Sequence, residues 1–131
     1  MARSKPVRVL LCNRYALFRE GIKALLPEGA AIEVIGEAAT AKQALSLVER
    51  RRPDVVLLDA TTLDSTGSNL TRRIKAIDPH VEVLILSLYD DHLLISSCLD
   101  AGAAGYVRNV DKPRQLRQAI CTACRRTHRA A

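Results

Sequence analysis

The stretch Val55–Asp59, with the sequence VVLLD, is an unbroken apolar run that ends in a carboxylate. Two further runs in the 131-residue chain have the same character, at residues 7–11 and 81–88. Strands buried on both faces have this nearly continuous Val, Ile and Leu composition, because helices cover both sides of a parallel sheet. The three runs therefore predict a central parallel sheet, with Asp59 at the carboxyl end of one of its strands.

Amphipathic stretches separate the apolar runs along the whole chain. The segments with strand character are 7–12, 32–36, 54–59, 82–88 and 104–107. The segments with a helical period of apolar residues are 17–26, 41–52, 69–77, 91–101 and 113–126. Pro and Gly residues follow most of the helical segments, as they do where helices end. For the first helix, the period predicts a buried stripe of Leu17, Ile22, Leu25 and Leu26.

Five alternating strand and helix segments predict a doubly wound α/β domain with right-handed crossovers. The usual strand order of such a five-stranded sheet is 2-1-3-4-5, and its ligands bind beyond the carboxyl ends of strands 1 and 3. We expect one domain over residues 1–124, followed by a basic tail or the start of a linker at 125–131.

Composition excludes several classes of protein. The chain is 48% apolar and 26% charged, which is ordinary for a globular domain. It has no apolar run near the roughly 20 residues that span a bilayer and no signal-peptide core, so we expect a cytoplasmic protein without membrane contact. Residues 110–131 carry most of the net charge of +6. Such a basic segment can contact nucleic acid, but a solvated helix face or linker is the simpler interpretation.

Cysteines and histidines suggest no metal or redox centre. Cys121 and Cys124 form a C-x-x-C pair on a helical pattern, without a second pair or a cluster of histidines nearby. Structural zinc sites need four such ligands, and a disulfide framework is unusual in a chain with a core of this size. The pair is best interpreted as two small residues on a helix face.

The predicted topology brings the loops after strands 1, 3, 4 and 5 to one edge of the sheet. Side chains at this edge are therefore candidates for a common pocket. They are Asn13, Arg14, Asp59, Thr61, Ser87, Tyr106 and Asn109.

Several segments resemble the receiver domain of response regulators, most closely that of LuxR/NarL-type transcription factors. These segments are RVLL at 8–11, ALFREG at 16–21, IEVIGEA at 32–38, RPDVVLLD at 52–59 and AGAAGY at 101–106. They occur in the right order through all five repeats and cover about residues 7–121. The resemblance implies a CheY-like fold and a signal-receiving, non-enzymatic role in a two-component system.

In that family, an acidic pair after strand 1 and the aspartate that ends strand 3 bind Mg²⁺, and a histidine kinase phosphorylates this aspartate. A Ser or Thr after strand 4 and a Lys after strand 5 bind the phosphoryl oxygens, while an aromatic residue on strand 5 changes its rotamer. The resemblance implies that Asp59 occupies the phosphoacceptor position. It likewise implies that Ser87 supplies the hydroxyl that binds a phosphoryl oxygen, and that Tyr106 is the aromatic residue that changes its rotamer.

The chain departs from the family pattern mainly at the chemical site. Asn13 and Arg14 replace the acidic pair, Asn109 replaces the Lys, and Leu63 replaces the usual Pro, whereas Gly67 is kept. Mg²⁺ prefers oxygen ligands in octahedral geometry, and Arg14 offers none. We therefore expect no bound metal or other cofactor and no catalytic residue.

Two interpretations of Arg14 remain open from the sequence. A guanidinium is the best bidentate partner for a carboxylate, which predicts an Arg14–Asp59 ion pair that fills the pocket. Alternatively, Arg14 is a solvated loop residue and Asp59 is hydrated.

The main functional hypothesis is an atypical receiver domain that works without magnesium-dependent phosphorylation of Asp59. The alternative is a receiver that a histidine kinase still phosphorylates on Asp59. A third, an unrelated flavodoxin-like module, lacks support because no Gly-rich phosphate loop follows strand 1. We expect a possible homodimer and a kinase or other regulatory protein as partners. DNA would be bound only through a helix-turn-helix domain, which this sequence does not contain.

Overall fold

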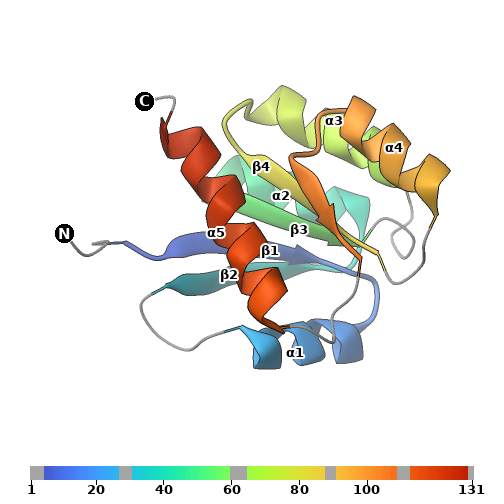
Figure 1. Ribbon diagram of the computed structural model, residues 1–131. Coiled ribbons are helices and arrows are strands. Elements are labelled where there is room, and N and C mark those ends of the chain that lie inside the picture. The colour runs from blue at the N-terminus through green and yellow to red at the C-terminus, as the bar shows by residue number, and fades with distance from the viewer. Residues whose placement is uncertain (1–4, 27–30, 60–64, 88–90, 109–112, 130–131) are drawn as a thin grey trace.

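The computed structural model describes residues 5–26, 31–59, 65–87, 91–108 and 113–129, the last five of them by their backbone alone. Within these ranges, strands and helices alternate along the chain (Figure 1). The strands are β1 (Val7–Cys12), β2 (Ile32–Ala38), β3 (Val55–Asp59), β4 (Glu82–Leu86) and β5 (Gly105–Val107). The helices are α1 (Ala16–Leu25), α2 (Ala41–Arg51), α3 (Gly67–Ile77), α4 (His92–Asp100) and α5 (Pro113–Arg129).

The sheet has the order β2-β1-β3-β4-β5, and every pairing is parallel. This confirms the predicted doubly wound fold. Figure 1 shows α1 and α5 against one face of the sheet, with α2, α3 and α4 against the other. Strand β3 lies in the centre, so its last residue, Asp59, has strands on both sides.

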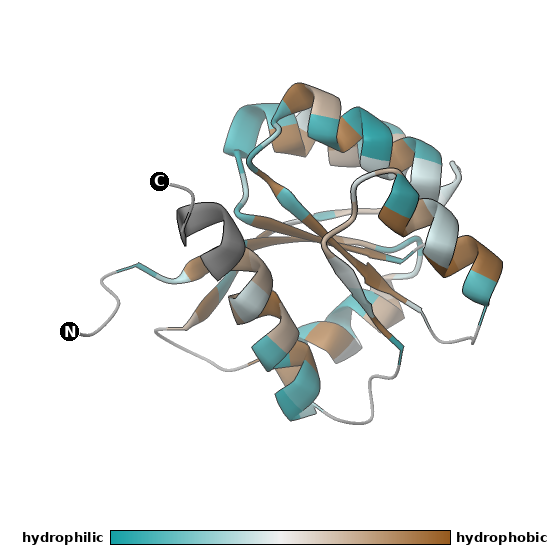
Figure 2. Ribbon diagram, turned by 45° about the horizontal axis from the view of Figure 1, so that its top comes forward, coloured by the Kyte–Doolittle hydropathy of each residue, from teal (hydrophilic) through white to brown (hydrophobic). Residues whose placement is uncertain are grey.

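The core consists of two apolar layers, one on each face of the sheet. Successive side chains of a strand point to opposite faces, so Leu57 packs with α1 and α5 while Leu58 packs with α2, α3 and α4. The strands are accordingly brown through the middle of the molecule in Figure 2, and teal residues lie on the outer faces of the helices. None of the helices in the described ranges is long and apolar enough to cross a membrane.

Element boundaries differ from the prediction by a few residues. Helix α3 begins at Gly67 rather than at residue 69, because the Thr66 hydroxyl accepts a hydrogen bond from the Asn69 N–H and caps its first turn. Helix α5 continues to Arg129 rather than to residue 126, since no Pro or Gly interrupts it. Most of the predicted tail is therefore helical.

The predicted stripe of the first helix is wrong at Leu17, which is 85% exposed. Ile22 and Leu26 are buried, and Phe18 packs against the same core layer. These three residues follow one another at intervals of four, which keeps them on one face of the helix. Leu17 lies about 100° around the helix from Phe18 and therefore faces outward.

Two helical leucines allow a direct test of these two environments. Leu70 in α3 is completely buried, whereas Leu17 in α1 is mostly exposed. We expect Leu70→Ala to lower the free energy of unfolding by about 2–5 kcal/mol, because it removes buried contacts and leaves a cavity. Leu17→Ala should change it by about 0.5 kcal/mol or less. Urea unfolding followed by circular dichroism measures both, and similar losses would contradict the placement of Leu17.

The cysteine thiols differ sharply in their environment. Cys12, Cys98 and Cys124 are buried, and Cys121 is half-buried. Burial raises the pKa of the Cys12 thiol to about 12, and it also raises the pKa of Cys98. Thiolate is the reactive form, and at pH 8 only about one in ten thousand Cys12 side chains would be thiolate at any moment, so Cys12 would react slowly.

Alkylation of the native protein should therefore select Cys121. We expect iodoacetamide at pH 8 to modify Cys121 first and to leave Cys12 intact until the protein unfolds, as peptide mass spectrometry would show. The variant Cys121→Ser should lose the fast phase of modification. Equal modification of Cys12 and Cys121 in the native protein would contradict the burial of Cys12.

Candidate functional site

Three buried polar side chains lie at the carboxyl edge of the sheet. Asp59 ends β3 and is 3% exposed, Asn13 directly follows β1, and Ser87 directly follows β4. Thr71 is the other buried polar residue in the described part of the chain. Buried polar groups are costly unless they are hydrogen-bonded, so their gathering at three adjacent strand ends identifies this edge as the candidate site.

Asn13 contacts the Asp59 carboxylate directly. Its Nδ2 donates a hydrogen bond to Asp59 Oδ2 at 2.9 Å. Its Oδ1 accepts a hydrogen bond from the backbone N–H of Tyr15 at 2.8 Å. A backbone N–H can only donate, so this second bond fixes which end of the amide faces Asp59. The side chain therefore presents N–H groups, and not its oxygen, to the carboxylate.

The main chain of Asn13 is held as firmly as its side chain. Its N–H donates to the carbonyl of Ala38, at the end of β2, at 3.0 Å. Its carbonyl accepts a hydrogen bond from Arg19 Nη1 at 2.7 Å. Helix α1 and strand β2 thus set the position of the residue that contacts Asp59.

Arg19 also forms an ion pair with Glu37 of β2. The Nε of Arg19 donates to Glu37 Oε1 at 2.8 Å, and Lys23 Nζ donates to Glu37 Oε2 at 2.7 Å. The hydrogen bond from Lys23, followed by the one from Arg19, holds the pKa of Glu37 below its usual value against the opposing effect of burial. Hydrogen bonds to Glu20 and Glu37 raise the pKa of Lys23. The cluster is therefore fully charged at neutral pH.

Arg14 is exposed. The direct Arg14–Asp59 ion pair stays a prediction. Asn13 is turned inward with both its side chain and its main chain bonded, so the next residue along the chain is directed to the surface. Asn13, the residue before Arg14, donates a hydrogen bond to the Asp59 carboxylate.

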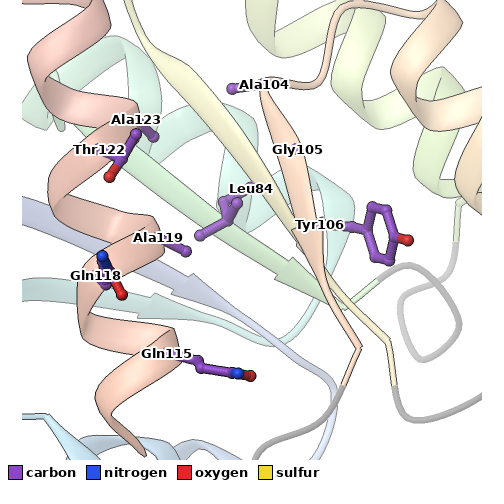
Figure 3. A pocket seen from close by; sticks show the side chains of 9 residues that line it. All are labelled: Leu84, Ala104, Gly105, Tyr106, Gln115, Gln118, Ala119, Thr122 and Ala123. Carbon is purple, nitrogen blue, oxygen red and sulfur yellow. The ribbon is translucent and has the colours of Figure 1, made fainter.

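Ser87 directly follows β4, and Tyr106 lies on β5. The backbone N–H of Ser87 donates to the Val107 carbonyl at 3.0 Å, which ties the end of β4 to β5. Tyr106 is 46% exposed. Figure 3 shows its ring on the side of β5 away from α5. Thr61 and Asn109, the remaining predicted site residues, lie outside the described residues.

A hollow of about 360 Å³ lies between β5 and α5 (Figure 3). Gln115, Gln118 and Thr122 of α5 line one side of it, and its floor is made of small apolar residues. None of its lining residues is charged, so it lacks a carboxylate like that of Asp59.

Sequence reasoning missed Arg19, Tyr15 and Glu37 as residues that shape the site. A signal for two of them was present, because Glu37 comes at the end of a predicted strand and Arg19 opens a predicted helix, with opposite charges. Nothing in the sequence marks the Tyr15 backbone as the partner of Asn13. Among the described residues, no three His, Cys, Asp or Glu side chains gather in a way that could bind a metal ion.

Comparisons with known proteins identify the family to which this fold belongs. Residues 9–121 match the family described as the response regulator receiver domain. The transcriptional regulatory protein DegU of Brevibacillus brevis is 34% identical over 101 residues, which cover 77% of this chain and 43% of DegU. The response regulator protein VraR of Staphylococcus aureus is 29% identical over 114 residues, which cover 87% of this chain and 54% of VraR. The chain thus spans about half the length of these relatives.

Solved structures show the same fold. The receiver domain of the putative response regulator NarL from Mycobacterium tuberculosis matches with a TM-score of 0.85 at 27% identity. The match covers 92% of this chain and 98% of the NarL domain. A LuxR-family two-component response regulator from Aurantimonas matches with a TM-score of 0.84 at 30% identity. This match covers 92% of this chain and 86% of the Aurantimonas chain. Together with the match over residues 9–121, these likenesses show that the chain belongs to the response regulator receiver domain family.

Proposed function

We propose that this receiver domain regulates its protein without magnesium-dependent phosphorylation of Asp59. The observation that carries the proposal is the orientation of Asn13, whose Nδ2 donates to Asp59 while its oxygen is taken by the Tyr15 N–H. A metal ion bound by Asp59 would need lone pairs from neighbouring oxygens. The group that faces Asp59 here carries protons, so it competes with a cation for the carboxylate.

The side chains available as metal ligands support the same conclusion. Asn13 and Arg14 stand where the family has two acids, and among the described residues no three His, Cys, Asp or Glu side chains gather in a way that could hold a metal ion. Phosphoryl transfer to a carboxylate relies on cations that stabilise the charge developing on the phosphoryl oxygens. The residues of this site therefore do not fit the magnesium ion that the family uses.

Membership of the receiver family indicates the general biological role of the domain. Receiver domains belong to two-component response regulators, and DegU is named a transcriptional regulatory protein. We propose that this domain likewise controls transcription in the cytoplasm, with DNA bound by a part of the protein outside this sequence. Its input would be a regulatory protein, a small ligand or self-association.

The competing function is a conventional phosphoacceptor. Asp59 and Ser87 are both kept, and they lie buried at the ends of adjacent strands. In this alternative, a histidine kinase would phosphorylate Asp59 despite the altered neighbours.

Chemical phosphorylation separates the two functions. We expect no phosphoryl adduct on the wild-type protein after incubation with acetyl phosphate and Mg²⁺, as measured by intact-mass spectrometry. The triple substitution Asn13→Asp, Arg14→Asp and Asn109→Lys restores the acidic pair and the lysine. It should raise the rate of adduct formation by at least about a hundredfold, because it supplies the cationic stabilisation.

Asp59→Ala in both backgrounds is the control that locates any adduct. It should abolish the adduct of the triple variant. The proposal is wrong if the wild-type protein gains a single phosphoryl group that Asp59→Ala removes.

A further inference from the structure

Asn13 makes a hydrogen bond through every polar group that it has. The N–H and the carbonyl of its main chain, together with Oδ1 and Nδ2 of its side chain, bond to Ala38, Arg19, Tyr15 and Asp59. A residue held at four points has one orientation. Its contact with Asp59 is therefore a fixed feature of the site and depends on the groups that hold the other three points.

Two of those points belong to the start of α1. Tyr15 is the N-cap residue of α1, and its N–H donates to the side-chain oxygen of Asn13. The Arg19 guanidinium donates to the main-chain carbonyl of Asn13. Tyr15 and Arg19 are themselves linked, because the Arg19 N–H donates to the Tyr15 carbonyl at 3.1 Å in the first turn of the helix. A displacement of Arg19 would thus disturb both the carbonyl and the amide of Asn13.

The Arg19 side chain is placed to act as a clamp. It is 15% exposed, and its Nε and Nη1 reach two different acceptors, Glu37 on β2 and the Asn13 carbonyl. The planar guanidinium holds several donors in fixed directions, which a lysine ammonium on a flexible stem does not. Lys23 bonds to the other oxygen of Glu37, so the oxygen that Arg19 uses is not shared with Lys23.

We propose that Arg19 is the positioning residue of the Asp59 site. It acts through Asn13. The Arg19 guanidinium bridges Glu37 of β2 and the Asn13 carbonyl, and this bridge keeps the Asn13 Nδ2 group directed at Asp59. The inference builds on the site of the proposed function, but it concerns the unphosphorylated protein and holds whether or not Asp59 can be phosphorylated. It makes α1 and the end of β2 the elements through which the Asp59 site can be altered from outside the pocket.

Side-chain amide exchange of Asn13 tests this role. The chain has three asparagines, Asn13, Asn69 and Asn109, so selective ¹⁵N labelling gives three pairs of side-chain signals, and Asn13→Ala assigns one of them. We expect Arg19→Met to speed solvent exchange of the Asn13 Nδ2 protons by about five- to tenfold, the factor that corresponds to one hydrogen bond of ordinary strength. The Asn69 signals serve as an internal reference.

Lys23→Met is the matched control. It removes the other cation on Glu37 and leaves the bond from Arg19 to Asn13 in place. We expect it to lower the melting temperature as Arg19→Met does, but to leave the Asn13 exchange rate and chemical shifts as in the wild type.

Two results would overturn the proposal. One is an unchanged Asn13 signal in Arg19→Met, and the other is an equal acceleration in Lys23→Met, which would indicate general loosening of the fold. Neither result bears on the acetyl phosphate experiment, so failure of this inference can be told apart from failure of the proposed function.

Discussion

A carboxylate buried at the end of a central strand needs polar partners, and in this protein Asn13 is one of them. The 2.9 Å hydrogen bond from Asn13 Nδ2 to Asp59 Oδ2 joins the ends of β1 and β3, the two central strands at the carboxyl edge of the sheet. An unpaired buried charge costs several kcal/mol, so the surroundings of Asn13 are arranged to keep this donor in place. The first turn of α1 and the end of β2 both serve that purpose.

The loss of magnesium chemistry that we propose would leave the receiver scaffold intact. The apolar layers on the two faces of the sheet depend on residues such as Leu57 and Leu58, which pack in the core layers and not among the polar residues at the carboxyl edge. A fold of this kind tolerates many different sites, because the loops at its carboxyl edge carry the function. In the function proposed above, the Asn13 amide contributes to stabilising the buried Asp59 carboxylate without a metal ion.

Much of the fold could be predicted from residue patterns alone. Buried parallel strands have a distinctive composition, so the run Val55–Asp59 located the centre of the sheet and the position of its terminal acid. The pattern was less reliable for α1, where Leu17 was expected inside and lies outside. A helical period defines a stripe only within about one residue at its edge, and tertiary packing decides which side chain at that edge is covered.

The sequence by itself determined the topology, the family and the loss of the acidic pair, because these depend on which residue types follow one another along the chain. Only the tertiary structure decided which neighbour meets Asp59. Asn13 and Arg14 are adjacent in sequence, and charge alone favours the arginine. The bonds from Tyr15, Arg19 and Ala38 fix the Asn13 amide inward and leave Arg14 exposed, and these partners come from α1 and β2, which only folding brings together.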